Sequence, residues 1–113
     1  MSYNIVKEKL DNGKLVILDG AMGSELEKNG AKMDKKLWCG TSSIEFPEIV
    51  KKVHEDYINA GADVITTNTY ASTPISMKNY GFEKSILEYN KKSVLIAKKA
   101  AENSKKDIAI AGS

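Results

Sequence analysis

The sequence predicts an α/β protein, in which parallel strands alternate with helices. Three short segments, 15–18, 64–67 and 108–111, are nearly continuous runs of apolar or β-branched residues. Such runs are typical of strands in a parallel sheet that is covered on both faces, because neither face then meets water. Between these segments apolar residues recur at helical spacing. The 113 residues are enough for one small domain.

The first helix is expected shortly after the first strand. Ser24 and Glu27 have the spacing of a capping box, and Gly30 is a suitable C-terminal stop for a short helix. The following segment, 31–45, has no clear periodicity. It is long enough to be a functional loop.

A second helix is predicted between Pro47, which suits a first helical turn, and Gly61, which suits a helix end. One face of this helix carries Ile49, Val50, Val53, Tyr57 and Ile58. His54 is expected on its surface or half-buried. A short third helix should begin at Thr73–Pro74 and close at Gly81.

A longer fourth helix is predicted at about 83–103, with its lysines directed outward. Its buried residues are expected to be Ile86, Leu87, Val94 and Ala97. The third predicted strand follows, and the sequence ends with it. Because three parallel strands would leave two open edges and little core, we expect residues 1–113 to be the first part of a larger domain.

The composition excludes several classes of function. All 17 basic residues are lysine and the net charge is +2, so bidentate arginine recognition of nucleic acid is impossible and no partner of this kind is expected. No apolar run approaches the ~20 residues that cross a bilayer. Residues 1–10 carry charges where a signal peptide needs an apolar core, so a cytoplasmic location is expected. Cys39, the single cysteine, is expected to be a free thiol without a role.

The candidate site lies at the carboxyl ends of the predicted strands, where α/β proteins bind ligands. Segments 19–23, 67–70 and 112–113 would converge there. Small residues in 19–23 let backbone N–H groups approach a ligand. The turn lacks the lysine of a phosphate-binding loop, and Asp19 would repel a phosphate. A suitable ligand would place an ammonium group at Asp19 and a carboxylate at the backbone N–H groups of the turn. A zwitterionic amino acid carries both groups.

Four stretches of this sequence resemble the amino-terminal third of the homocysteine S-methyltransferases: "ILDGAMGSELEKNG", "LWCGTSSIEFPEIVKKVHEDYINAGADVITTNTYAST", "GF" and "IAGS". The resemblance implies a (β/α)8 TIM barrel, of which this chain would supply the first three β/α units. It also implies a cytoplasmic transferase of methionine biosynthesis, in which zinc binds the homocysteine sulfur. The methyl donor stays open among S-methylmethionine, betaine, S-adenosylmethionine and a methylated folate or cobalamin.

By this resemblance, five residues belong to the substrate side. Asp19 would hold the homocysteine ammonium, and Gly20 and Ala21 would form the turn whose backbone meets the substrate. Thr67 and Asn68 would close around the amino-acid end. The alternatives are that Asp19 caps the following turn and that Thr67 and Asn68 only make hydrogen bonds at the barrel rim.

Two aromatic residues would lie on the methyl-donor side. Trp38 resembles an aromatic residue that helps to cage the donor, and a cationic methyl group over an aromatic face is attracted to it. Tyr70 is the second candidate. The alternatives are a loop anchor for Trp38 and ordinary packing for Tyr70.

The metal end of the site is expected outside these residues. The resemblance implies three zinc-binding cysteines beyond the third strand, and Cys39 matches none of them. The expected partners are homocysteine and a small methyl donor, with self-association of an incomplete barrel. The alternative hypothesis is a non-catalytic truncated fragment or half-barrel that at most binds an amino acid.

Overall fold

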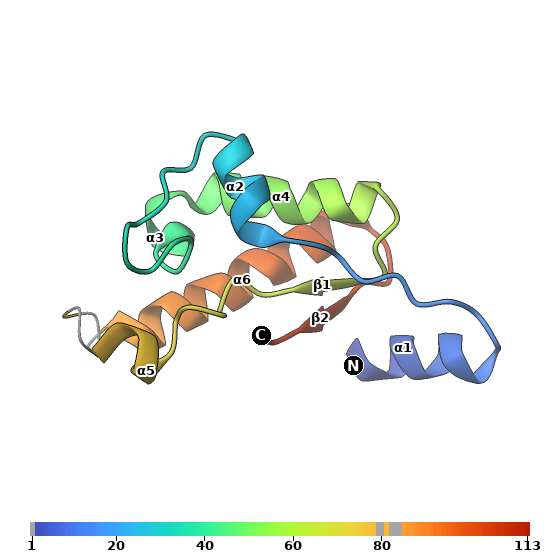
Figure 1. Ribbon diagram of the computed structural model, residues 1–113. Coiled ribbons are helices and arrows are strands. Elements are labelled where there is room, and N and C mark those ends of the chain that lie inside the picture. Colours follow the sequence, from blue (N-terminus) through green and yellow to red (C-terminus); the bar gives the residue numbers. More distant parts are fainter. Residues whose placement is uncertain (1, 79–80, 82–84) are drawn as a thin grey trace.

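The computed structural model describes residues 2–78, 81 and 85–113, which form a mixed helix and strand structure (Figure 1). The predicted α/β class is therefore confirmed. In chain order the elements are α1 (Ser2–Asp11), α2 (Met22–Lys28), α3 (Ser42–Glu45), α4 (Pro47–Asn59), β1 (Val64–Thr66), α5 (Pro74–Met77), α6 (Ile86–Ser104) and β2 (Ala109–Ala111).

The second and third predicted strands are confirmed as β1 and β2, each slightly shorter than expected. They pair in parallel, with Val64 opposite Ala109 and Thr66 opposite Ala111. Beyond the last paired residues, the Thr67 N–H donates to the Ala111 carbonyl over 2.9 Å. Both strands therefore end at the same edge of the sheet, as the site prediction requires.

The predicted burial of segment 15–18 was wrong, and its pairing is shorter than a regular strand. This segment is extended but forms only one parallel bridge, between Leu18 and Val64, among the described residues. Leu15 and Leu18 are 81% and 67% exposed. The segment has the apolar composition of a buried strand, but nothing in the described part of the chain packs over these side chains.

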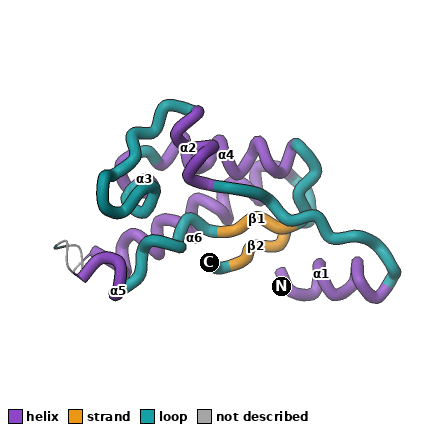
Figure 2. Tube along the Cα trace, in the orientation of Figure 1, coloured by secondary structure: helices purple, strands orange, loops and turns teal. Residues whose placement is uncertain are grey.

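The sheet is covered by α4 and α6, which pack together on it (Figure 2). Ala97 and Ala100 of α6 are fully buried, and their small side chains let the helix approach the sheet closely. The apolar cluster between these layers consists of Ile58, Ile65, Ala97, Ala100 and Ile108.

The glycines predicted to end two helices do so, whereas the capping box predicted at the start of the first of these helices does not form. Helix α2 begins at Met22, so Ser24 lies inside it and the expected capping box is absent; the N-cap is Ala21, without a side-chain hydrogen bond. Gly30 and Gly61 have positive φ angles of 94° and 112° just beyond α2 and α4. Glycine adopts this left-handed conformation without steric cost, which ends both helices as predicted.

Helix α4 starts at Pro47 as predicted, but His54 is fully buried, so the expected exposure was wrong. Neither imidazole nitrogen finds a hydrogen-bond partner among the described residues. Burial lowers the pKa of His54 to about 4, against an opposing effect of the Asp19 charge. The imidazole is therefore neutral at neutral pH.

The predicted register of α6 was partly wrong. Ala97 is buried and the lysines are exposed as expected, but Leu87 is 66% exposed and Val94 also faces outward. The buried face instead contains Tyr89, Ser93, Ile96, Ala97 and Ala100. The helix starts at Ile86; the predicted positions 83 and 84 lie outside the described residues. Helix α5 starts at Pro74 as expected, and the Thr73 hydroxyl accepts from the Ser76 N–H.

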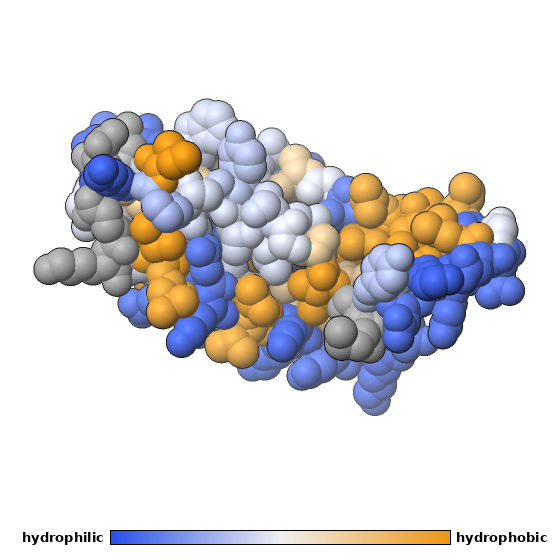
Figure 3. Space-filling view, turned by 90° about the horizontal axis from the view of Figure 1, so that it is seen from below, coloured by the Kyte–Doolittle hydropathy of each residue, from blue (hydrophilic) through white to orange (hydrophobic). Residues whose placement is uncertain are grey.

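Helix α1 was not predicted. It contacts β2, and Lys9 forms an ion pair with Asp63 just before β1. The face drawn in Figure 3 shows apolar patches between hydrophilic side chains. In the part of the chain that the structure describes, no helix combines the length and the apolar character that a membrane span requires.

Candidate functional site

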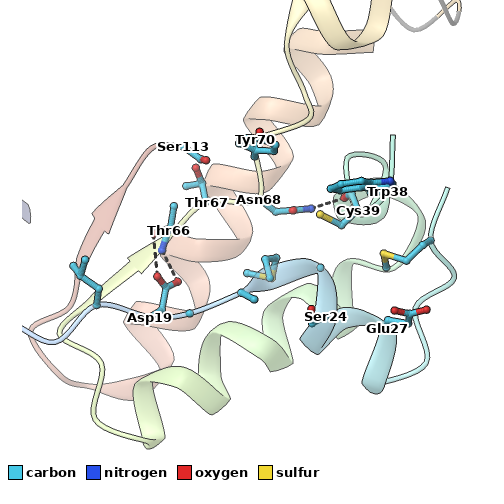
Figure 4. A pocket seen from close by; sticks show the side chains of 16 residues that line it. Asp19, Ser24, Glu27, Trp38, Cys39, Thr66, Thr67, Asn68, Tyr70 and Ser113 are labelled. Atoms are coloured by element: carbon cyan, nitrogen blue, oxygen red, sulfur yellow. Dashed lines mark hydrogen bonds between the residues drawn. The ribbon is translucent and has the colours of Figure 1, made fainter. Parts of the chain in front are cut away.

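A cavity of about 700 Å³ opens where the extended segment 15–18 and the two strands end (Figure 4). Three parts of the chain line it: the turn into α2, the loop before α3, and the ends of β1 and β2. All seven residues that the sequence suggested are among its lining residues, which are Leu18, Asp19, Gly20, Ala21, Met22, Gly23, Ser24, Glu27, Met33, Trp38, Cys39, Thr66, Thr67, Asn68, Tyr70 and Ser113.

Asp19 is held in place by Thr66 of β1. The Asp19 carboxylate accepts hydrogen bonds from the Thr66 N–H (2.7 Å) and the Thr66 hydroxyl (3.0 Å), while its own N–H donates to Val64 (2.9 Å). A carboxylate offers about four acceptor positions. Asp19 therefore keeps capacity for a donor in the cavity. Sequence reasoning missed Thr66, although a polar β-branched residue at a strand end was a usable signal.

Asn68 connects the end of β1 to the loop before α3. Its side-chain amide donates to the Cys39 carbonyl (2.8 Å) and the Ser43 hydroxyl (3.3 Å). The Ser93 hydroxyl hydrogen-bonds to Ser43 Oγ (2.6 Å) and to the Asn68 carbonyl (3.0 Å). These three side chains are buried, so the network fixes both the Asn68 side chain and the loop.

Thr67 lies beside Asn68 and is also buried. Its hydroxyl is 2.9 Å from the hydroxyl of Thr69, which in turn contacts the backbone of Ser113. This chain of contacts joins the ends of β1 and β2 at the cavity.

Trp38 projects from a tight turn in the loop before α3. Asp34 and Trp38 exchange two backbone hydrogen bonds of 2.9 and 3.0 Å. The Asp34 carboxylate accepts from the N–H groups of Leu37 and Lys36, which lowers the pKa of Asp34. Trp38 has a φ of 51° and is 68% exposed. Left-handed φ is strained for a large side chain, and this turn holds the indole at the cavity mouth.

Tyr70 and Cys39 complete this side of the cavity (Figure 4). Tyr70 is 77% exposed, so ordinary core packing does not explain its position. Cys39 is half-buried, and burial raises the pKa of its thiol. The thiol is therefore protonated at neutral pH and is a poor nucleophile.

The charge of the cavity favours a positively charged ligand group. Its described lining residues include two carboxylates, Asp19 and Glu27, and no lysine. In Figure 4, Asp19 and Trp38 lie on opposite sides of the cavity. The first turn of α2 also lines it, and unpaired N–H groups at a helix start favour a carboxylate.

The residues that the structure describes do not make a metal site. Among the described residues, no group of three or more His, Cys, Asp or Glu side chains could hold a metal ion. Cys39 reaches the cavity, whereas His54 is sealed from solvent and is absent from its lining.

The fold and this cavity define an α/β chain with a cavity at its strand ends, lined by two carboxylates and two exposed aromatic side chains. The family model for homocysteine S-methyltransferase matches residues 16–113, and the chain belongs to that family. It is 44% identical over 70 residues to homocysteine S-methyltransferase YbgG of Bacillus subtilis, an alignment covering 62% of this chain and 22% of that protein. It is 36% identical over 103 residues to the homocysteine S-methyltransferase of Escherichia coli, covering 88% of this chain and 32% of that protein.

The structure is also similar to the metallated form of the homocysteine methyltransferase MmuM from Escherichia coli. The TM-score is 0.81 at 34% sequence identity, and the match covers 96% of this chain and 40% of that chain. The described residues thus have the fold of part of that enzyme. This chain spans about a third or less of the length of the two curated relatives.

Proposed function

We propose that this chain is the amino-acid-binding part of a homocysteine S-methyltransferase, which transfers a methyl group from a small donor to the homocysteine sulfur and forms methionine. The observation that carries the proposal is the Asp19 carboxylate, fixed by Thr66 at the cavity beside the start of α2. Asp19 binds the substrate ammonium, and the backbone of the 20–23 turn binds its carboxylate. The MmuM likeness supports segment 15–18, β1 and β2 as the first strands of a (β/α)8 barrel.

In this arrangement the chain orients homocysteine and does not make the new bond itself. Asp19 and the turn hold the amino-acid end, Thr67 and Asn68 close the site beside them, and the sulfur points toward Trp38. Correct orientation alone lowers the barrier of a bimolecular transfer. The zinc ion that the family resemblance implies needs ligands from outside these residues. A cytoplasmic location remains a prediction from the N-terminal sequence.

The proposed methyl donor is a small molecule whose methyl group is attached to a cationic nitrogen or sulfur, such as S-methylmethionine, betaine or S-adenosylmethionine. Trp38 and Tyr70 offer exposed aromatic faces at the cavity mouth, and a cationic methyl group is attracted to such a face. Glu27 adds negative charge, whereas an anionic methylated folate finds no lysine among the described lining residues.

The alternative is a chain that binds an amino acid without catalysis, which is favoured by the missing metal ligands among the described residues. The deciding experiment supplies the complete gene product with Zn²⁺, L-homocysteine and each donor in turn, and measures methionine by mass spectrometry. Methionine formed with a cationic donor supports the enzyme. Homocysteine binding without product from any donor supports the alternative, and absence of binding contradicts both.

A further inference from the structure

Tyr57 reaches from α4 to the turn at the start of α2. Its hydroxyl donates a 2.7 Å hydrogen bond to the Ala21 carbonyl, between residues 36 positions apart in the sequence. The acceptor belongs to the turn that binds the amino-acid end of the ligand in the proposed function. Tyr57 itself is absent from the cavity lining.

The same side chain explains the glycine at position 20. A Cβ atom built on Gly20 would lie 2.9 Å from the Tyr57 hydroxyl oxygen and 3.3 Å from ring atom Cε1. Side-chain carbons do not approach an oxygen this closely without displacing it. Gly20 is not among the glycines with positive φ. The need for glycine therefore comes from the tyrosine ring that occupies the side-chain position.

The turn is thus anchored from two elements. Thr66 of β1 holds the Asp19 side chain through its N–H and hydroxyl, and Tyr57 of α4 holds the Ala21 carbonyl. Burial raises the pKa of Tyr57, with smaller contributions from the charges of Glu25 and Asp19. The hydroxyl therefore keeps the proton that it donates throughout the neutral pH range.

We propose that Tyr57 is a positioning residue, which fixes the 20–21 turn against α4 and thereby sets the backbone that receives the homocysteine carboxylate. This inference rests on the proposed function. Tyr57 does not contact the substrate. Its effect should therefore appear in homocysteine binding and leave the chemical step and the donor side unchanged.

The test compares Tyr57→Phe with wild type in the complete gene product. Tyr3→Phe is the matched control, because Tyr3 is 70% exposed on α1. In Tyr57→Phe the Kd and KM for L-homocysteine should rise by about 3- to 10-fold, the effect of losing one neutral hydrogen bond, with kcat and the donor KM unchanged. Amide hydrogen exchange at 20–23 should become faster, while that of α6 stays the same. Tyr3→Phe should behave as wild type.

A second pair of variants tests the contact with Gly20 independently of the ligand. Gly20→Ala should lower the thermal midpoint more in the wild-type background than in Tyr57→Phe, because the nearest atom is then no longer the hydroxyl oxygen. The inference would be overturned if Gly20→Ala lowered the thermal midpoint equally in both backgrounds. It would also be overturned if Tyr57→Phe left either the amide exchange at 20–23 or the homocysteine affinity unchanged. If the wild type itself binds no homocysteine, the proposed function is wrong, and Tyr57 then has no role in homocysteine binding. The exchange and thermal data would then still show whether Tyr57 anchors the turn.

Discussion

Replacing Asp19 with asparagine tests the proposed ammonium contact with little change in shape. In the structure, the Asp19 carboxylate accepts from the Thr66 N–H at 2.7 Å and from the Thr66 hydroxyl at 3.0 Å. An asparagine oxygen can keep the first bond. Its amide can donate to the hydroxyl, which is able to accept as well as donate. We therefore expect the fold to be retained while the negative charge is lost.

The expected loss of affinity follows from the charge. A hydrogen bond that involves a charged group contributes about 1.5–3 kcal/mol, roughly twice a neutral one. At about 1.4 kcal/mol for each factor of ten, Asp19→Asn should weaken homocysteine binding by roughly 10- to 150-fold. Asp19 is half-buried at the cavity, so solvent screening places the expected value in the lower part of this range.

The assay is calorimetric titration of the complete gene product with L-homocysteine. Asp63→Asn is the matched control, because Asp63 precedes the opposite end of β1, where it accepts from the Ile17 N–H (2.9 Å) and pairs with Lys9. The control should lose some stability and keep its affinity for homocysteine. Unchanged affinity in Asp19→Asn, or an equal loss in both variants, would refute the assignment of the ammonium to Asp19.

Three further results are expected. Trp38→Ala should raise the donor KM and leave the homocysteine KM nearly unchanged in steady-state kinetics; the opposite pattern would place Trp38 on the substrate side. His54 is the only histidine, and its pKa of about 4 in the folded chain lies below the ordinary 6.5. The unfolded chain therefore gains protons first, and the unfolding free energy should fall by on the order of 3 kcal/mol as the pH drops from about 6.5 to 4. In denaturant titrations, His54→Gln should remove most of this pH dependence of the unfolding free energy. An unchanged slope of unfolding free energy against pH would contradict the assignment to His54. The 113-residue chain alone should show no methyltransferase activity, hold no stoichiometric zinc after dialysis, and self-associate in size-exclusion chromatography through its exposed apolar side chains; one tightly bound zinc per monomeric chain would contradict this.

The sequence predicted well those features that local chemistry determines. Pro47 begins α4, and Gly30 and Gly61 follow helix ends with positive φ. The apolar runs that became β1 and β2 were also found, so the segments that line the cavity could be placed at one sheet edge. The lining residues at the strand ends could be named for the same reason, because the carboxyl ends of parallel strands lie at one edge of the sheet; Trp38, which lies in the loop before α3, was named only from the family resemblance.

The remaining features depend on contacts between distant residues. Leu87 is as apolar as Ile96, yet α6 buries Ile96 because that side chain joins the apolar cluster of Leu26, Val50 and Val53 from α2 and α4. Burial of Ser93 is explained by its hydroxyl contacts with Ser43 and Asn68, which no helical periodicity reveals.

Segment 15–18 and the site also depend on contacts between distant residues. The apolar run at 15–18 indicated a buried strand, but burial requires neighbours that the described residues do not supply. The anchoring of Asp19 by Thr66 and of Ala21 by Tyr57 spans 47 and 36 positions, respectively. Contacts at such separations emerge only from the three-dimensional arrangement.

The central claim is that the cavity at the strand ends binds homocysteine by its amino-acid end. The most direct measurement is a crystal structure of the complete gene product with L-homocysteine bound. We expect the ammonium within hydrogen-bonding distance of Asp19, the carboxylate at the backbone of the 20–23 turn, and the sulfur directed toward the Trp38 side. Homocysteine bound outside this cavity, or bound within it with its ammonium away from Asp19, would contradict the claim.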